Sequence, residues 1–180
     1  QKFPNVTSKN IDLTSVFNEF SNKFSLKKNE LALANSRSRL RMTSLYYLAQ
    51  NNNSLVVGTG NKIEDFGIGF FTKYGDGGVD ISPIADLLKS EVYNIGKELG
   101  VNDNILNAPP TDGLWQDNRT DEDQIGASYM QLEWAMNFKG NVNTLSMEQK
   151  KVFEIYNKLN KINQHKMTKI PVCIIPDHLK

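Results

Sequence analysis

Apolar residues recur at helical spacing along most of the chain, and polar or glycine-rich segments separate these stretches. The spacing predicts four long helices, over residues 26–51, 84–100, 121–139 and 146–164. Gly100 and Gly140 follow the second and third of them, where glycine commonly ends a helix. A shorter helix is predicted nearer the start, capped by Asp12 or Thr14 and extending to Asn22.

Two segments lack this spacing. Residues 54–58 read Ser-Leu-Val-Val-Gly, a continuous apolar run typical of a strand buried on both faces of a parallel sheet. Residues 66–83 hold five glycines and are expected to form an ordered loop. A helix, a buried strand and a glycine-rich turn in succession predict an α/β fold with a parallel sheet flanked by helices. Ligands of such sheets bind beyond the carboxyl ends of the strands, here at residues 59–64.

Size and composition predict one globular domain over residues 1–180, with 39% hydrophobic and 23% charged residues. The net charge of +1 provides no field that would attract nucleic acid. No apolar run approaches the roughly 18 residues of a membrane helix, so we expect neither a nucleic-acid nor a membrane partner. The single cysteine, Cys173, excludes an internal disulfide framework and fits a cytoplasmic location.

Three arginines alternate within the first long predicted helix, at Arg37, Arg39 and Arg41. Residues four apart share a helix face, so Arg37 and Arg41 lie together and Arg39 points elsewhere. Planar guanidinium groups suit phosphate oxygens, and such a helix could address two phosphate groups. Taken alone, the pattern is explained more simply as a solvated basic face.

The Gly58-Thr-Gly60 turn follows the predicted strand. The dinucleotide-binding fingerprint requires a third glycine where Ile63 stands, which excludes a Rossmann dehydrogenase. Thr59 could still meet a nucleotide, and Glu64 could hold a hard cation such as Mg²⁺. An ordinary tight turn is the simpler explanation of the two glycines by themselves.

Residues 70–80 combine aromatic, glycine and charged side chains in a way that stability alone does not require. The glycines permit close approach of the backbone to a ligand. Asp76 and Asp80 could orient an amine or a ribose, and Lys73 supplies a compact cation. The alternative is an Ω-loop with capped aspartates, and we favour a functional loop.

In their order and spacing these segments resemble the ammonia-dependent NAD synthetases, from about Asn35 to Pro171. The strongest block runs from Gly58 to Asp80 and includes Gly-Thr-Gly-Asn-Lys-x-Glu and Phe-Thr-Lys-Tyr-Gly-Asp-Gly-Gly-x-Asp. Further matches are Asn35-x-Arg-x-Arg-x-Arg-Met42, Pro83, Lys89, Pro110-Thr111, Asp121-Glu122 and His165-Lys166. The resemblance implies a Rossmann-like fold of the adenine nucleotide alpha hydrolase type.

The reaction that the resemblance implies is an ATP-dependent amidation. The carboxylate of nicotinic acid adenine dinucleotide attacks ATP and forms an adenylated intermediate and pyrophosphate, and ammonia then displaces AMP to give NAD. A carboxylate requires such activation because its oxygen is a poor leaving group, and the enzyme must exclude water from the intermediate.

The resemblance also implies roles for particular residues. Thr59, Lys89 and Thr111 would contact ATP. Arg41 would support either nucleotide, and Glu64 would bind Mg²⁺. The deamido dinucleotide would be bound by Arg39, Lys73, Asp80, His165 and Lys166. Asp76 and Asp80 are the predicted catalytic residues around ammonia, and Asp80 is the better candidate of the two.

One family motif, the pyrophosphate-binding loop Ser-Gly-Gly-x-Asp-Ser, does not occur in the 180 residues, and the sequence starts at Gln1. We therefore expect a domain without its first strand, that loop and its first helix, and with weak ATP binding and no turnover alone. The resemblance implies free ammonia as nitrogen donor and a homodimer, for which residues 31–49 are the candidate contact. The alternatives are another ATP-pyrophosphatase that adenylates a different substrate and a non-catalytic nucleotide-binding subunit.

Overall fold

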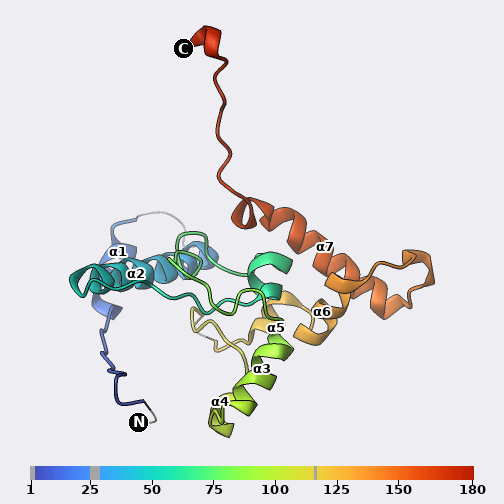
Figure 1. Ribbon diagram of the computed structural model, residues 1–180, viewed down its shortest axis with the longest axis horizontal. Coiled ribbons are helices and arrows are strands. Elements are labelled where there is room, and N and C mark those ends of the chain that lie inside the picture. The colour runs from blue at the N-terminus through green and yellow to red at the C-terminus, as the bar shows by residue number, and fades with distance from the viewer. Residues whose placement is uncertain (1–2, 25–28, 116) are drawn as a thin grey trace.

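The computed structural model describes residues 3–24, 29–115 and 117–180. Seven α-helices occur in these ranges (Figure 1): α1 (Thr14–Asn22), α2 (Glu30–Asn51), α3 (Lys89–Glu98), α4 (Asp103–Leu106), α5 (Asp121–Ile125), α6 (Tyr129–Asn137) and α7 (Met147–Met167). The same ranges include one π-helix and two 3-10 helices: η1 (Ile63–Ile68), η2 (Val142–Thr144) and η3 (Asp177–Leu179).

The predicted parallel sheet is not present in the described ranges, and the α/β prediction is wrong. Two extended segments meet there at one isolated parallel bridge, between Val57 and Ile81, where the Gly58 N–H donates to the Ile81 carbonyl at 2.7 Å. Leu55 is 64% exposed and Val57 is 53% exposed, whereas strands of parallel sheets are covered on both faces. The apolar run 54–58 is extended as expected, but no ladder of strands extends from it in the described residues.

Three of the predicted helices are confirmed, as α1, α2 and α7. The α2 helix begins after Asn29, whose side chain accepts a hydrogen bond from the Ala32 N–H at 3.0 Å. Residues 26–28, which the prediction included, lie outside the described ranges. Ser146 caps α7 in a capping box with Gln149, the arrangement that satisfies unpaired amides at a helix start.

Two predicted helices differ in extent from the observed ones. The expected helix over 121–139 is divided into α5 and α6, because Gly126 takes a left-handed φ of +84° and Ser128 caps a new helix. The helix expected over 84–100 begins only at Lys89, where the Glu91 side chain accepts a hydrogen bond from the Leu88 N–H. The short α4 and the π-helix η1, which enters the predicted loop 66–83, were not predicted.

The core lies where η1 packs against α6 and α7. Ile63, Ile68 and Leu132 are fully buried there, and side chains from α7 such as Ile155 and Leu159 cover them. The helices α1 and α2 lie on the opposite side of the molecule, and the segment between α2 and α3 connects the two parts (Figure 1). This connecting segment carries the residues on which the family resemblance depends.

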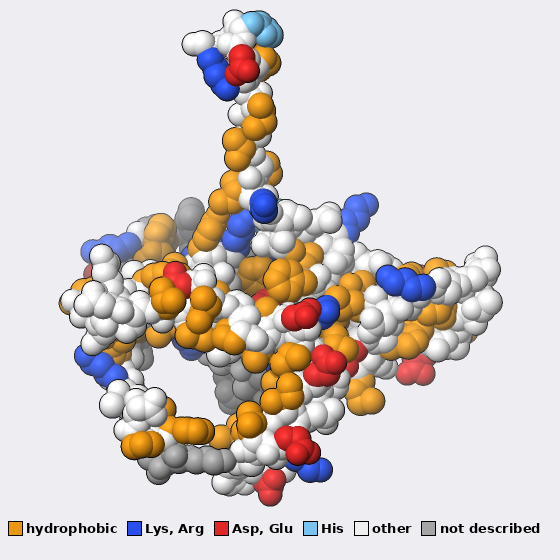
Figure 2. Space-filling model, in the orientation of Figure 1, with side chains coloured by type: hydrophobic (Ala, Val, Ile, Leu, Met, Phe, Trp, Pro, Cys, Tyr) orange, Lys and Arg blue, Asp and Glu red, His pale blue; other side chains and the backbone are white. Residues whose placement is uncertain are grey.

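The C-terminal segment after α7 extends away from the body of the molecule (Figures 1 and 2). The apolar side chains of this segment are exposed, with Val172 at 75% and Ile174 at 79%. In the described part of the chain, no helix has both the length and the apolar character that crossing a membrane requires.

Candidate functional site

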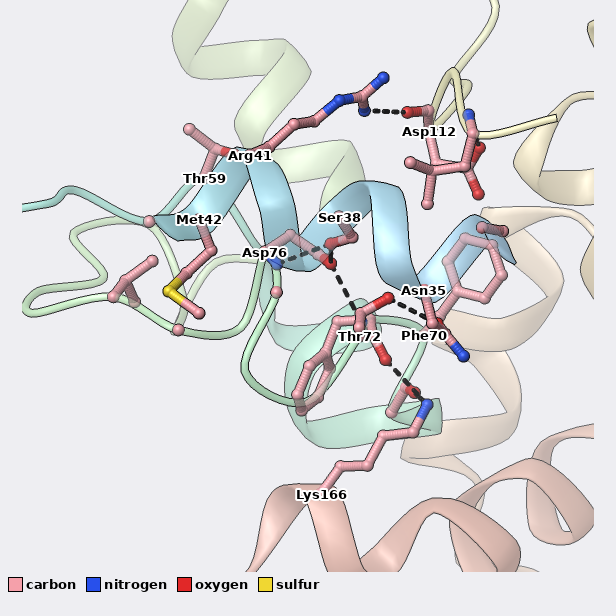
Figure 3. Close-up of a pocket in the computed structure, with 18 of the residues that line it drawn as sticks. Asn35, Ser38, Arg41, Met42, Thr59, Phe70, Thr72, Asp76, Asp112 and Lys166 are labelled. Carbon is pink, nitrogen blue, oxygen red and sulfur yellow. Dashed lines mark hydrogen bonds between the residues drawn. The ribbon is translucent and has the colours of Figure 1, made fainter. Parts of the chain in front are cut away.

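A cavity of about 450 Å³ lies between α2, the extended segment 56–59, the loop 69–79 and the end of α7. Figure 3 shows that helix α2 crosses one side of the cavity and Lys166 approaches from α7. The α2 residues in its wall are spaced mainly three or four apart and share a helix face; they include Leu31, Ala34, Ser38, Met42 and Leu45. The wall is largely apolar, and the polar groups in it come from a few defined positions.

The loop 72–76 is fixed to α2 by partly buried hydrogen bonds. Asp76 Oδ1 accepts from Ser38 Oγ at 2.7 Å and from the Thr72 N–H at 3.0 Å. Thr72 Oγ1 donates to Asn35 Oδ1 at 2.7 Å. Ser38 is 4% exposed, and a Cβ atom on Gly75 would lie 2.2 Å from its Oγ. The loop therefore needs glycine at position 75 to approach α2 this closely.

Lys166 holds the same loop from the opposite side. Its Nζ donates to the carbonyl oxygens of Gly69 and Phe71, both at 2.8 Å. Burial lowers the pKa of Lys166, and the nearby Asp76 carboxylate opposes that shift. A lysine ammonium group has three donors, and the two loop carbonyls use two of them at the edge of the cavity.

Asp80, the preferred catalytic prediction, ties the extended segment to α2. Its Oδ2 accepts from the Val56 N–H at 2.8 Å, and its Oδ1 accepts from Tyr46 OH at 3.1 Å. Burial and the Asp80 carboxylate raise the pKa of Tyr46. Asp76 is among the residues that line the cavity, and Asp80 is not.

The other predicted substrate-binding residues come from three segments: α2, the loop 69–79 and the end of α7. Arg39 Nε donates to the Lys73 carbonyl at 3.2 Å, and Lys73 Nζ donates to the His165 carbonyl at 2.5 Å. The structure therefore brings Arg39, Lys73 and His165 to one margin of the loop, beside Lys166. The His165 ring itself lies against the Ile162 carbonyl of its own helix, with Nδ1 at 3.1 Å. Cationic side chains such as those of Arg39 and Lys73 suit an anionic ligand such as a phosphate.

The predicted ATP contacts are more dispersed. Thr59 and Arg41 line the cavity, and Arg41 donates to the carbonyl oxygens of Asp112 and Gly113 at 3.3 and 3.1 Å. Thr111 belongs to the same loop as Asp112, and its hydroxyl donates to the Arg119 carbonyl at 3.3 Å. Arg41 thus connects α2 to the loop of Thr111, whereas Lys89 belongs to a separate cluster.

That cluster contains Glu64, Lys89, Tyr129 and Asp121. Glu64 Oε1 accepts from Lys89 Nζ at 2.8 Å and from Tyr129 OH at 2.6 Å. The Tyr129 hydroxyl also lies 3.1 Å from Asp121 Oδ2, and Lys89 Nζ lies 4.7 Å from the Tyr129 ring centroid. Burial raises the pKa of Asp121 and of Tyr129, and the Glu64 carboxylate raises both further. The hydrogen bond with Tyr129 opposes the shift in the pKa of Asp121.

Glu64 offers one carboxylate to a magnesium ion that would arrive with phosphate groups, and its Oε1 is occupied here by Lys89 and Tyr129. Mg²⁺ commonly takes one or two carboxylates from the protein and the remaining ligands from phosphates and water. Glu64 is such a carboxylate, at the end of the 58–64 turn. Within the described residues, no group of three or more His, Cys, Asp or Glu side chains could hold a metal ion.

The glycine-rich turn 58–60 approaches the π-helix closely. A Cβ atom on Gly60 would lie 2.2 Å from the Asp65 carboxylate. Burial raises the pKa of Asp65 to about 6, and the neighbouring Glu64 and Asp76 carboxylates add to the shift. Gly60 is therefore required for packing against an acidic side chain, which is a different reason from phosphate binding.

A second cavity, of about 670 Å³, lies between α1, α2 and residues 114–119. Its wall includes Arg37, whose guanidinium lies 4.2 Å from the Phe17 ring centroid, and Arg119, which lies 4.3 Å from the Trp115 ring centroid. None of the predicted site residues lines this cavity.

The sequence analysis did not identify Ser38 and Tyr129 as residues of the candidate site. Ser38 has a local signal, because it lies between two of the alternating arginines on the α2 face that includes Ala34 and Met42. Tyr129 has none, because it is 65 residues from Glu64 and only the packing of α6 against η1 brings them together.

The comparisons with known proteins identify the class of protein. The family model described as NAD synthase matches residues 3–170. The chain therefore belongs to the NAD synthase family, and the predicted resemblance is confirmed.

Individual relatives agree with this assignment. The chain is 40% identical over 189 residues to the NH(3)-dependent NAD(+) synthetase of Syntrophomonas wolfei, a match that covers 100% of the chain and 71% of that protein. The corresponding enzyme of Mesoplasma florum is 42% identical over 139 residues, which cover 77% of the chain and 53% of that protein. The chain thus spans between about half and 71% of the length of these relatives.

Two solved structures have folds similar to that of this chain. The NMN synthetase of Francisella tularensis aligns with a TM-score of 0.78 and 34% identity, over 93% of this chain and 65% of that one. The NH3-dependent NAD synthetase of Campylobacter jejuni, solved with a nitrate ion, aligns with a TM-score of 0.70 and 25% identity, over 91% and 64%.

Proposed function

We propose that this chain forms the substrate-binding part of an ammonia-dependent NAD synthetase. The reaction is the ATP-dependent amidation of nicotinic acid adenine dinucleotide to NAD through an adenylated intermediate. One observation carries the proposal: the loop 69–80, where the family resemblance is strongest, lines the cavity and is held by Ser38 and Asn35 on one side and Lys166 on the other. Such a fixed loop meets the requirement of preorganised binding.

In this proposal one set of residues binds the acid dinucleotide and another set binds ATP. Arg39, Lys73, His165 and Lys166 form the margin that binds the phosphates of the acid dinucleotide. Thr59, Lys89 and Thr111 contact ATP, and Arg41 supports either nucleotide. Glu64 holds Mg²⁺, which when bound neutralises phosphate charge during adenylation.

The ammonia site is assigned to the aspartates of the loop. Asp76 lines the cavity with one oxygen held by Ser38 and Thr72, whereas Asp80 does not line the cavity and both of its oxygens accept hydrogen bonds. This geometry favours Asp76 as the group that orients ammonia, with Asp80 as a support of the loop. A carboxylate attracts ammonium and is suited to accept its proton.

The homodimer proposed for the family remains assigned to α2. Tyr47 on this helix is 70% exposed, and Arg39 on the same helix is also exposed. A dimer through α2 would place a second copy close to the margin formed by Arg39 and Lys73.

A second candidate function is amidation of the mononucleotide, which would yield NMN. The similarity to the Francisella tularensis NMN synthetase, at 34% identity and a TM-score of 0.78, favours it. Both reactions activate the same nicotinic acid carboxylate, and they differ in whether the site also binds an AMP half.

Calorimetric titration of the chain with nicotinic acid adenine dinucleotide and with nicotinic acid mononucleotide tests both candidates. We expect saturable binding that is tighter for the dinucleotide, and about tenfold weaker in Lys73→Ala, because a charge-assisted contact is lost. Lys161→Ala, an exposed change on α7, serves as the control and should bind like the wild type. Tighter binding of the mononucleotide would select the second candidate, and no binding of either acid by a folded chain would contradict the proposed function.

A further inference from the structure

A row of three side chains on α7 binds consecutive carbonyl groups where the π-helix η1 ends and the glycine-rich loop begins. The three residues are spaced three apart and therefore share one face of α7. They are Asn160, Asn163 and Lys166, which donate to the carbonyl oxygens of Gly67, Ile68 and Gly69 at 2.7, 2.9 and 2.8 Å, respectively. The approach of Lys166 to the loop is visible in Figure 3.

Asn163 is the member of this row for which the sequence analysis assigned no role, although it lines the cavity. Lys166 lines the cavity as well, whereas Asn160, one turn earlier, does not. The loop backbone packs directly against Asn163, because a Cβ atom on Gly69 would lie 2.5 Å from the Asn163 Cβ. This close packing and the hydrogen bond to Ile68 hold the Asn163 side chain in one place at the cavity wall.

The hydrogen bond to Ile68 also determines which end of the Asn163 amide remains available. A backbone carbonyl can only accept, so the amide nitrogen must face Ile68 and the amide oxygen is the other end. Among residues 3–24, 29–115 and 117–180, Asn163 Oδ1 has no hydrogen-bond partner, and it is not one of the atoms that are buried without a partner. Asn163 therefore offers the cavity a neutral acceptor that a ligand can reach.

The chemistry of the proposed substrates restricts what such an acceptor can bind. Phosphate and carboxylate oxygens are acceptors themselves when ionised, whereas the hydroxyl groups of a ribose can donate. Asp76, assigned above to ammonia, lines the same cavity, so the nicotinic acid ring must bind near it. The ribose attached to this ring is then the sugar closest to Asn163, and Lys166 lies one turn further along α7 as a cation for the phosphate that follows.

We propose that Asn163 Oδ1 accepts a hydrogen bond from a hydroxyl group of the nicotinic ribose, and that Asn163 is a specificity-determining residue for this sugar. The inference rests on the proposed function, and it applies to the dinucleotide and the mononucleotide alike because both contain this ribose. A neutral acceptor suits this position, since a carboxylate there would repel the neighbouring phosphate.

The first test changes the ligand and leaves the protein as it is. Calorimetry compares nicotinic acid adenine dinucleotide with its analogues that lack the 2′- or the 3′-hydroxyl group of the nicotinic ribose. We expect at least one analogue to bind the wild type about fivefold more weakly than the parent compound, because a hydrogen bond between neutral groups is lost.

The second test shows whether Asn163 causes this discrimination. In Asn163→Ala the ratio of the two affinities should fall below about twofold, because the acceptor is absent for both ligands. Asn160→Ala is the matched control: it loses the same kind of bond to an η1 carbonyl but lies outside the cavity wall, so it should keep the fivefold ratio. A general loosening of the loop affects both ligands and leaves the ratio unchanged.

The outcomes distinguish failure of this inference from failure of the proposed function. Equal binding of the parent and both analogues by the wild type would overturn the inference, and so would a fivefold ratio that persists in folded Asn163→Ala. Loss of the ratio in Asn160→Ala as well would show that the row acts only by holding the loop, which also overturns it. Absence of binding of the parent compound by the folded wild type would contradict the proposed function itself, and the inference with it.

Discussion

The two aspartates of the glycine-rich loop differ in the groups that hold their side chains. Asp76 is held by Ser38 and Thr72 at the cavity wall, whereas Asp80 is held by Val56 and Tyr46 and is not itself part of the wall. The sequence indicated both aspartates because they occur in one glycine-rich loop. The sequence analysis ranked Asp80 first, whereas the geometry favours Asp76, because the α2 partners that distinguish the two aspartates lie 38 and 34 residues away in the sequence.

Ser38→Ala tests whether the contact to α2 stabilises the loop. The change removes the donor to Asp76 Oδ1 and the acceptor of the Asp76 N–H, so we expect a loss of about 1–2 kcal/mol in the free energy of unfolding. Urea unfolding measures it. Ser36→Ala is the control, because Ser36 Oγ donates only to the Ala32 carbonyl of its own helix at an exposed position. Equal effects of the two changes would show that the loop contact contributes little.

Asp65 predicts a specific dependence of stability on pH. Its pKa is raised from 3.8 to about 6, so the folded state binds more protons than the unfolded state between about pH 4 and 6. The free energy of unfolding should therefore fall as pH rises through this window. Asp65→Asn should remove that part of the fall and stabilise the protein at pH 7, as measured by urea unfolding at several pH values. Asp103→Asn, at an exposed position, should leave the pH profile as it is in the wild type.

At the scale of elements, the long amphipathic helices were predictable and their interruptions were not. The spacing of apolar residues located α2 and α7, and capping residues marked their starts. The division between α5 and α6 depends on the left-handed conformation of Gly126, which a periodic pattern does not reveal because glycine is also tolerated within helices. The apolar run 54–58 predicted a buried strand, but burial depends on neighbours that the described residues do not provide.

Gly126→Ala tests the importance of this division. Alanine at a φ of +84° is strained, and we expect a loss of about 1–2 kcal/mol in the free energy of unfolding. Gly126→Asn should cost less, because asparagine tolerates left-handed conformations better. Thermal and urea unfolding of the two variants give the comparison, and equal stability of Gly126→Ala and the wild type would contradict the assigned strain.

At the scale of the whole molecule, the cavity lies between the helical core and α2, and the two are held by different kinds of interaction. The core joins η1, α6 and α7, whereas α2 reaches the rest largely through hydrogen bonds from residues such as Asn35, Ser38 and Arg41. The sequence located the loop 58–80 because its motif is continuous. It could not show that α2 and Lys166 hold this loop from opposite sides, because that depends on the packing of distant segments.

The most direct test of this account is amide chemical-shift mapping of the chain during titration with nicotinic acid adenine dinucleotide. The account predicts shifts concentrated in residues 69–80, at Asn35 and Ser38 on α2, and around Lys166. Shifts confined to the second cavity, near Asn18 and Arg119, or no shifts in a chain with a folded spectrum, would contradict the assignment of the substrate site.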